Sequence, residues 1–235
     1  MRDLLKTIKI TDQAPLKLFQ KYCFSLENAL SHKDFSEKVT IKQKSNSGYT
    51  GYLQDKIKNS QEFSDVTSNF AFYRLAGDLM NIPLDDVKII YPHFRIDLPN
   101  YFKGQQDKMS LPWHQEAAYY IPRGDCTPDS VVISIAMHDC NYENGAIRVG
   151  SDTQSNIINH HSFFKDESHK RFYRVECPQP KKFIVAETKF GEAVCFDFKR
   201  PHCSGENKSN LVRLTLLMRA SSKIELNRYK NKQYS

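Results

Sequence analysis

The sequence predicts a mainly β fold with a helical N-terminal part, and two observations along the chain predict this class. In the first 85 residues, apolar side chains recur at the three- and four-residue spacing of helices that bury one face. After that point, short runs rich in Val, Ile, Leu, Phe and Thr follow one another, which is typical of strands. We therefore expect an all-β core preceded by a helical annex.

The helical pattern is clearest in two segments. Leu16, Phe19 and Cys23 fall on one helical face, and a second apolar face extends over residues 70–80. Between these segments, residues 45–51 are polar and contain two glycines, which indicates a loop because glycine weakens a helix interior. The N-terminal part is therefore expected to consist of helices joined by loops.

Six short runs carry the strand signal. They are rich in β-branched and aromatic residues, and they cover residues 87–91, 131–137, 146–149, 183–186, 193–198 and 211–218. Asn144-Gly145 separates two of the runs and predicts a hairpin, because a type I′ turn needs positive φ at both central positions. The insert at 159–180 has no clear pattern.

A length of 235 residues and an apolar content of 40% suit one domain with one core. We expect the domain to cover 1–235, with a mostly helical part at 1–85, the β core at 86–220 and a frayed basic tail at 221–235. No apolar run long enough for a membrane span or a signal peptide is present, so a cytoplasmic location is expected. The six scattered cysteines are expected to be reduced thiols.

The formal charge of +7 keeps a nucleic-acid partner open as an alternative. Much of the excess charge lies in two short patches, residues 38–44 and 223–232, whose composition suits solvated surface. Solvated lysines explain the charge more simply. We therefore do not expect a nucleic-acid partner.

One short segment carries the residue types of a metal site. His114 and Glu116 are two positions apart, and side chains at i and i+2 of a strand point to the same face. His202 follows 88 residues after His114, behind an expected strand, and can supply a third ligand. Two histidines and one carboxylate on one side of a metal form the facial triad of non-haem Fe(II) oxygenases, which leaves positions open for co-substrate and dioxygen.

An arginine lies at an informative spacing from this candidate triad. Arg213 comes eleven positions after His202, at the start of an apolar strand. Burying an arginine requires an anionic partner, and a guanidinium group binds a carboxylate through two parallel hydrogen bonds, as a dicarboxylate co-substrate would require. Four other histidines are weaker candidates for the third ligand because none precedes such an arginine: His138, His160, His161 and His169.

Five motifs occur together in one order along the chain. They are an arginine-bearing strand, a Pro-Trp-His-Gln-Glu segment, a segment with an Asn-Gly turn, a Gly-Glu-Ala-Val strand and a His-Cys-Ser to Arg cluster, at residues 91–97, 112–116, 141–149, 191–196 and 202–213. By this order and spacing, residues 87–220 resemble the phytanoyl-CoA dioxygenase-like branch of the Fe(II)/2-oxoglutarate-dependent oxygenases. The resemblance implies a double-stranded β-helix, which is a cupin-like jelly roll.

The resemblance also implies a set of cofactors. Fe(II) would bind His114, Glu116 and His202, with 2-oxoglutarate as co-substrate and dioxygen (O2) as oxidant. The family usually has Asp at the position of Glu116, so the carboxylate here has one more methylene of reach. Since an acidic ligand is present, the related halogenases, which need that position empty, are disfavoured.

On the same resemblance, five further residues are expected to bind the co-substrate or to line its pocket. Arg213 and Ser204 would hold the distal carboxylate of 2-oxoglutarate. His93 or Arg95 would line the same pocket if their shared strand face points into the barrel. Tyr120 would contact co-substrate or substrate, although core packing explains an aromatic residue there equally well.

The implied reaction is hydroxylation of a C–H bond in a small-molecule substrate, with release of succinate and CO2. Two alternatives from other classes stay open. One is a jelly roll that binds a metal or ligand without turnover, and the other is a basic nucleic-acid-binding protein, which would show salt-dependent affinity.

Overall fold

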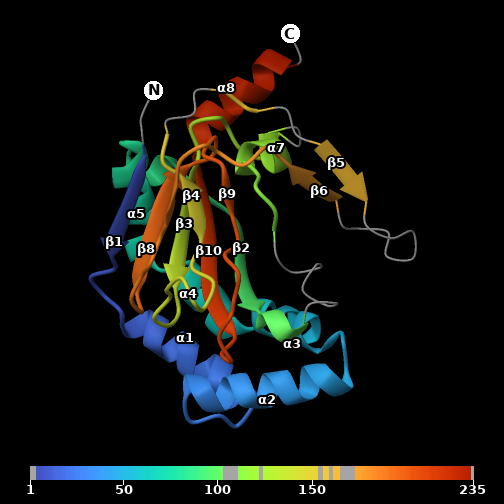
Figure 1. Ribbon diagram of the computed structural model, residues 1–235. Coiled ribbons are helices and arrows are strands. Elements are labelled where there is room, and N and C mark those ends of the chain that lie inside the picture. The colour runs from blue at the N-terminus through green and yellow to red at the C-terminus, as the bar shows by residue number, and fades with distance from the viewer. Residues whose placement is uncertain are drawn as a thin grey trace.

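A five-stranded antiparallel sheet forms the centre of the structure. The structure is a computed structural model, and it describes residues 4–102, 111–121, 124–152, 156–158, 161–164 and 173–233. β10 lies between β3 and β2 and pairs with both (Figure 1). In sheet order the strands are β1 (Leu5–Lys9), β8 (Glu192–Asp197), β3 (Val131–Ala136), β10 (Arg213–Ser222) and β2 (Val87–Asp97).

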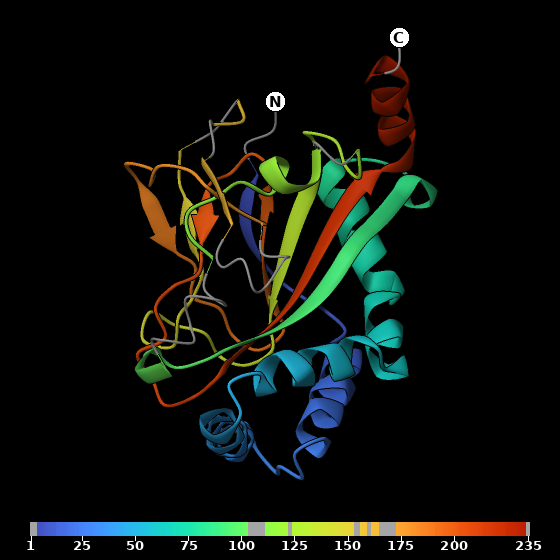
Figure 2. The same cartoon turned by 90° about the vertical axis from the view of Figure 1, so that its right-hand side faces the viewer.

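A three-stranded antiparallel sheet packs on one face of the large sheet (Figure 2). Its strands are β7 (Phe183–Val185), β4 (Arg148–Gly150) and β9 (His202–Cys203). A separate two-stranded antiparallel sheet contains β5 (His161–Phe164) and β6 (Tyr173–Glu176). Val132, Phe196 and Leu217 of the large sheet are buried in one cluster with Val149 of the small sheet. Two antiparallel sheets that share a core confirm the predicted jelly roll.

Helices cover the opposite face of the large sheet (Figure 2). Phe19 packs edge-on against Phe94 of β2, with ring centroids 5.3 Å apart, so the predicted apolar faces do meet the sheet. None of the helices in the described part of the chain is long and apolar enough to cross a membrane. The helices are α1 (Ala14–Ser25), α2 (His32–Ser45), α3 (Tyr49–Lys58), α4 (Gln61–Thr67) and α5 (Phe70–Met80).

Polar side chains fix where several of these helices begin and end. Ser31, Ser60 and Asn69 each accept a hydrogen bond from a backbone N–H group in the first turn of α2, α4 and α5, at 3.2, 3.1 and 2.9 Å. Those N–H groups have no partner within the helix, so the caps satisfy them. Asn81 ends α5 in a left-handed conformation with φ of 53°.

The loop expected at residues 45–51 is shorter than predicted. α2 continues to Ser45 and α3 begins at Tyr49, where the Asn46 side chain accepts a bond from Gly48 N–H at 3.0 Å. Gly51 lies inside α3. A glycine destabilises a helix by only about 1 kcal/mol, and the burial of apolar residues of the same helix outweighs this cost. A strand, β1, also precedes the helices, which the sequence did not predict.

The hairpin predicted at Asn144-Gly145 is wrong. β3 and β4 lie in different sheets, and only Gly145 of the pair has positive φ, at 87°. The Asn144 side chain instead accepts from Asn141 N–H at 2.7 Å and donates to Asp139 O at 2.8 Å. These local bonds close the turn, and the chain then crosses to the small sheet.

The basic C-terminal tail was expected to be frayed, and this expectation is also wrong for most of its length. β10 runs to Ser222 and continues directly into α8 (Lys223–Gln233). The carboxylate of Asp86 accepts from the Ser222 hydroxyl at 2.6 Å and from Ile224 N–H at 2.8 Å, so it caps the helix start. Leu226 is buried and anchors the helix.

Candidate metal centre

The three predicted metal ligands meet at one place in the fold. One ligand atom each from His114, Glu116 and His202 lies within 4.8 Å of the other two. The three side chains are buried, with 1%, 2% and 5% of their surface exposed. Two imidazoles and one carboxylate at this spacing can bind one divalent cation on one side and leave the other side open.

Backbone hydrogen bonds bring the two histidines together across 88 residues of sequence. His114 N–H donates to His202 O at 3.0 Å, and His202 N–H donates to His114 O at 2.9 Å. The strand expected for His114 and Glu116 is therefore reduced to a single bridge, since Glu116 is the first residue of α7 (Glu116–Tyr120). Gln115 between them is extended, with φ of −113° and ψ of 135°, which keeps both side chains on one side.

The ring nitrogens of both histidines are arranged for metal binding. His114 Nδ1 lies 2.7 Å from Pro112 O and His202 Nδ1 lies 3.0 Å from Arg200 O, so each Nδ1 carries the proton. Each Nε2 is then left with its lone pair. His114 Nε2 is buried without a hydrogen-bond partner, and a cation would satisfy it.

The charge states also suit a metal. Burial, reinforced by His202, lowers the pKa of His114 to about 3, so its imidazole is neutral at pH 7. Burial alone would raise the pKa of Glu116, but the positive charge of Arg219 outweighs it and holds the pKa below its ordinary value. Deprotonated ligands in a buried site therefore fit a divalent transition metal.

Arg213 is buried as predicted, and it is already paired with an acidic residue. Its Nε donates to Asp97 Oδ2 at 2.9 Å, its Nη2 donates to the same oxygen and its Nη1 donates to Gly145 O. Burial would raise the pKa of Asp97, but Arg213 and Arg95 lower it to about 2. The cavity beside Arg213 measures about 20 Å³, which is room for about one water molecule.

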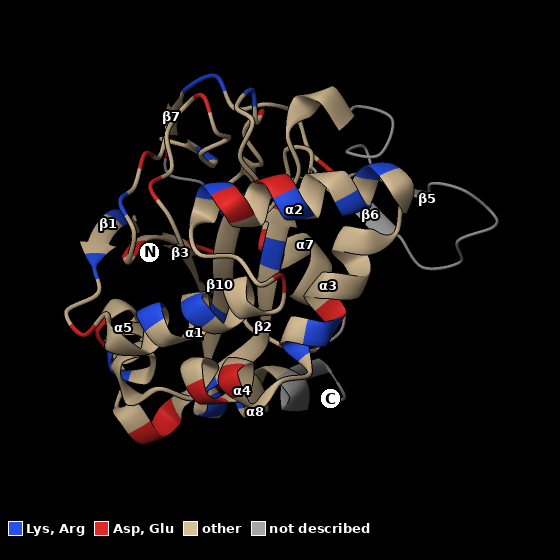
Figure 3. Ribbon diagram, turned by 90° about the horizontal axis from the view of Figure 1, so that it is seen from below, with Lys and Arg blue, Asp and Glu red and all other residues tan. Residues whose placement is uncertain are grey.

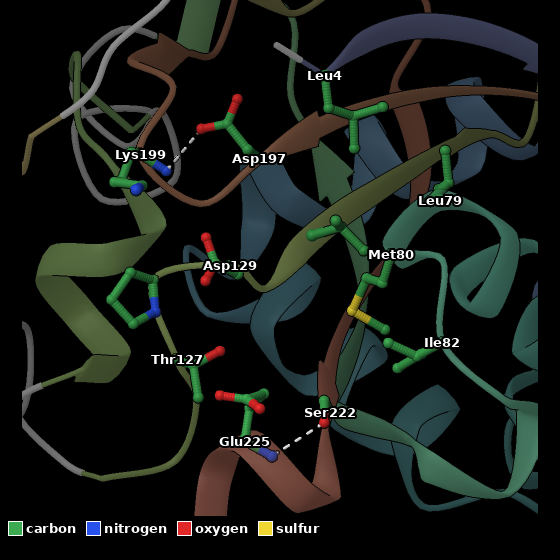
Figure 4. Close-up of a pocket in the computed structure, with 12 residues that line it drawn as sticks. Leu4, Leu79, Met80, Ile82, Thr127, Asp129, Asp197, Lys199, Ser222 and Glu225 are labelled. Atoms are coloured by element: carbon green, nitrogen blue, oxygen red, sulfur yellow. Dashed lines mark hydrogen bonds between the residues drawn. The ribbon is translucent and has the colours of Figure 1, made fainter. Parts of the chain in front are cut away.

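A larger cavity of about 320 Å³ lies elsewhere (Figure 4). It is lined by Leu79, Met80 and Ile82 on the helical side and by the acidic residues Asp129 and Asp197. Asp197 follows Phe196 in β8, and consecutive strand side chains point to opposite faces. Because the Phe196 ring lies 4.6 Å from the His202 ring, the cavity and the metal ligands are on opposite faces of the large sheet.

Comparison with known families agrees with the fold and with the cluster of ligands. The family described as phytanoyl-CoA dioxygenase (PhyH) matches residues 18–215, which is most of the chain. The chain belongs to the phytanoyl-CoA dioxygenase family. This membership confirms the resemblance seen in the sequence. A search of curated proteins finds no match to this PhyH-family chain.

Solved structures share the PhyH fold at low sequence identity. EvdO2 from Micromonospora carbonacea var. aurantiaca has a TM-score of 0.52 and 19% identity over 73% of this chain, which spans 64% of EvdO2. AviO1 from Streptomyces viridochromogenes Tue57 has a TM-score of 0.55 and 13% identity, covering 94% of this chain and 90% of its own. The epimerase SnoN, solved with Fe3+, alpha ketoglutarate and nogalamycin RO, has a TM-score of 0.57 and 10% identity over 94% and 80%.

The remaining predicted residues of this PhyH-family chain lie in two groups. His93 and Arg95 face the interior of the jelly roll, opposite Leu217 and Thr215 of β10, and Arg95 donates to Asp97 at 2.7 Å. The sequence alone did not decide whether this strand face points into the barrel. Burial and then Arg95 lower the pKa of His93 to about 4.

Ser204 and Tyr120 lie in different surroundings. The Ser204 hydroxyl accepts from Leu111 N–H at 3.3 Å, and the structure shows no hydrogen bond between Ser204 and Arg213 among its described residues. Tyr120 packs on the guanidinium group of Arg219, 4.8 Å from its ring centre, and stacks with Tyr91 at 5.7 Å. Their predicted roles stay predictions.

Sequence reasoning missed two residues that contact the metal ligands or their neighbours. Arg219 forms two hydrogen bonds with the Glu116 carboxylate. Gln115 is fully buried and ties the metal-binding segment to residues 156–158, through bonds of 3.1 Å to Asn156 O and 2.7 Å from Ile158 N–H. A second charged residue directly after the predicted apolar strand 211–218, inside what the structure shows as β10, was the available signal for Arg219.

Proposed function

We propose that this chain is an Fe(II)- and 2-oxoglutarate-dependent dioxygenase in which His114, Glu116 and His202 hold the iron. The observation that carries the proposal is the buried cluster of three ligand atoms within 4.8 Å in a chain of the PhyH family. The SnoN complex with Fe3+ and alpha ketoglutarate supports the same pair of cofactors. Bound iron would supply dioxygen activation coupled to decarboxylation of 2-oxoglutarate to succinate and CO2.

The protein's own residues would bind, orient and exclude water. The carbonyl groups of Pro112 and Arg200 hold the two imidazoles in the tautomer that presents Nε2. Phe196 packs against His202, and its apolar neighbours keep water from that side of the site. Positioning of this kind is the part of the catalysis that a protein contributes to cofactor chemistry.

Arg213 is the proposed anchor for the distal carboxylate of 2-oxoglutarate, because it is a buried guanidinium group in the jelly-roll interior. Because its Nε and Nη2 both donate to Asp97 and the adjoining cavity is only about 20 Å³, we propose that the co-substrate takes over part of this guanidinium group from Asp97. Ser204, His93, Arg95 and Tyr120 are the proposed further contacts of co-substrate or substrate.

For the reaction itself, we propose hydroxylation of a C–H bond in a small organic molecule. SnoN is called an epimerase and has the same fold, so the oxidative outcome has to be measured for each protein. Mass spectrometry of product formed under 18O2 separates the outcomes, because hydroxylation incorporates one labelled oxygen atom and epimerisation incorporates none.

Surface charge favours a small molecule over a nucleic acid. Figure 3 shows basic and acidic residues interleaved along α2, where Lys33, Asp34, Glu37 and Lys38 follow closely on one another. Lys38 also pairs with Asp34 at 3.1 Å. Acidic groups among the basic ones on α2 would repel a phosphate backbone, so this helix does not favour a nucleic-acid partner.

The test is the visible charge-transfer band that forms when 2-oxoglutarate chelates Fe(II) under anaerobic conditions. We expect the band in wild-type protein, its loss in His202→Ala, and its loss or displacement in Arg213→Ala. Binding of iron without any band would favour the jelly roll that binds a metal without turnover. Absence of iron binding altogether would overturn the metal site itself.

A further inference from the structure

Two buried arginines on one face of β10 each hold a carboxylate, and the second carboxylate belongs to a proposed metal ligand. Arg219 donates from Nε to Glu116 Oε2 and from Nη2 to Glu116 Oε1, both at 2.9 Å. Only 6% of Arg219 and 2% of Glu116 is exposed. This two-pronged geometry is the strongest arrangement available to a guanidinium group and a carboxylate.

The guanidinium group of Arg219 is itself held from two further directions. Its Nη1 donates to Tyr91 O at 3.1 Å, and its Cζ lies 4.8 Å from the ring centre of Tyr120. Tyr91 has φ of 41°, and the pairing of β10 with β2 shifts register between Leu217 and Arg219. A non-glycine residue with positive φ persists only where its surroundings demand it, and here the bulge presents the Tyr91 carbonyl to Arg219.

One of the two carboxylate oxygens that Arg219 holds also faces His202. Glu116 Oε1 lies 3.7 Å from His202 Nε2 and accepts from Arg219 Nη2. A carboxylate oxygen has two lone pairs, so Oε1 can accept from Arg219 and still present a lone pair to a cation. Without Arg219, the three rotatable bonds of Glu116 would let its carboxylate turn away from the histidines.

We propose that Arg219 is the positioning residue of the metal centre. It orients the Glu116 carboxylate for metal binding at a position where the family usually has Asp. The extra methylene group of Glu116 lets its carboxylate reach the guanidinium group of Arg219. The two hydrogen bonds from that group then hold one carboxylate oxygen toward the proposed metal position. This inference rests on the proposed function only in assuming that a divalent cation binds His114, Glu116 and His202. It predicts that Glu116 and Arg219 act as one unit.

The test is a double-mutant cycle on metal affinity, measured by titration calorimetry with Mn(II) in the absence of 2-oxoglutarate. Arg219→Met should weaken Mn(II) binding by about 10- to 100-fold, which is typical of losing a group that orients a metal ligand. Arg219→Lys keeps the charge and loses the two-pronged contact, so it should recover only part of the affinity. Glu116→Asp should also bind more weakly.

In the Glu116→Asp background, Arg219→Met should change the affinity by no more than about twofold, because the shorter carboxylate no longer reaches the guanidinium group. Ser221→Ala is the matched control, since it removes a buried, hydrogen-bonded side chain two residues after Arg219 in β10 and has no proposed role in binding. Its Mn(II) affinity should stay within about twofold of wild type. The visible d–d spectrum of bound Co(II) should change in Arg219→Lys and stay unchanged in Ser221→Ala.

Wild-type Mn(II) affinity in both Arg219→Met and Arg219→Lys would overturn the proposal while leaving the proposed function intact. Equal losses in Ser221→Ala and Arg219→Met, or full additivity in the cycle, would overturn it as well. If Arg219→Met does not fold, Arg219→Lys and its Co(II) spectrum decide the question. Failure of wild-type protein to bind Mn(II), by contrast, would count against the proposed function.

Discussion

Asp97 and Arg213 lie directly opposite each other on β2 and β10, and their side chains form a buried ion pair. Arg95 shares the same carboxylate at 2.7 Å. An internal carboxylate therefore occupies the guanidinium group that we propose for the co-substrate. If 2-oxoglutarate binds there as proposed, the two carboxylates would compete for one guanidinium group, and Asp97 would help to set the co-substrate affinity.

Replacing Asp97 with Asn tests this competition. Without ligand, Asp97→Asn should lose about 3 kcal/mol of unfolding free energy, because a buried arginine loses its counter-ion. Added 2-oxoglutarate should raise the midpoint of urea unfolding more in the variant than in wild type, since the ligand then supplies the missing charge. Equal shifts in both proteins would show that 2-oxoglutarate does not pair with Arg213.

Acidification should destabilise the metal-free protein well above the range in which carboxylates titrate. Burial lowers the pKa of His138 and His114 to about 3 and that of His93 to about 4, whereas unfolded histidine titrates near 6.5. Below pH 6.5 the unfolded chain thus binds more protons than the folded chain, so the free energy of unfolding falls with pH. At pH 5 each of these histidines should cost about 2 kcal/mol.

Urea unfolding in the presence of EDTA, from pH 8 to pH 5, measures this loss. His138→Gln removes one of the titrating groups and lies outside the proposed catalytic residues, so it should flatten the profile by the contribution of one histidine. A profile that is level down to pH 5, or that has the same slope in His138→Gln, would contradict the prediction.

Two glycines support the carbonyl group that Arg213 binds. Gly145, with φ of 87°, packs on Gly205, and a Cβ added at Gly205 would overlap the carbonyl oxygen of Ala146. Gly205→Ala should therefore lose about 1–3 kcal/mol of stability and weaken 2-oxoglutarate binding through displacement of Gly145 O from Arg213. Gly51→Ala is the control, because a Cβ added at Gly51 meets nothing within 4 Å. This substitution should stabilise α3 by about 0.5–1 kcal/mol.

Gln115 should protect the segment that it binds. Gln115→Ala leaves Ile158 N–H without its 2.7 Å partner, so the amide hydrogen of Ile158 should exchange faster with solvent. The loss of buried hydrogen bonds should also cost about 1–3 kcal/mol of stability. Hydrogen-exchange mass spectrometry measures the first effect, and unchanged exchange in peptides from 156–158 would contradict it.

The sequence predicted the features that depend on local pattern. The strands at 131–136, 192–197 and 213–222 were visible because burial of most of their side chains fills them with apolar residues, whereas only the first part of the strand at 87–97, residues 87–91, was predicted. The three metal-ligand candidates were found because His114 and Glu116 are close in sequence and His202 has a recognisable spacing from Arg213.

The features that sequence did not predict depend on pairing between distant segments. Asn144-Gly145 has the composition of a hairpin turn, but which sheet the next strand joins is decided by the whole fold. Arg219 and Glu116 are 103 residues apart, and Arg213 and Asp97 are 116 apart, so neither ion pair leaves a local pattern. β1 joins β8 across nearly the full chain and was missed for the same reason.

The reciprocal backbone bonds between His114 and His202 have a consequence for how the protein acquires its metal. The two imidazoles converge only after chain segments 88 residues apart have paired, and contacts of such sequence separation form slowly. A nascent or partly folded chain would thus have no competent site. Metal should consequently bind only after the jelly roll has formed. The rate at which the metal-binding signal appears during refolding would then measure the rate of the last stage of folding.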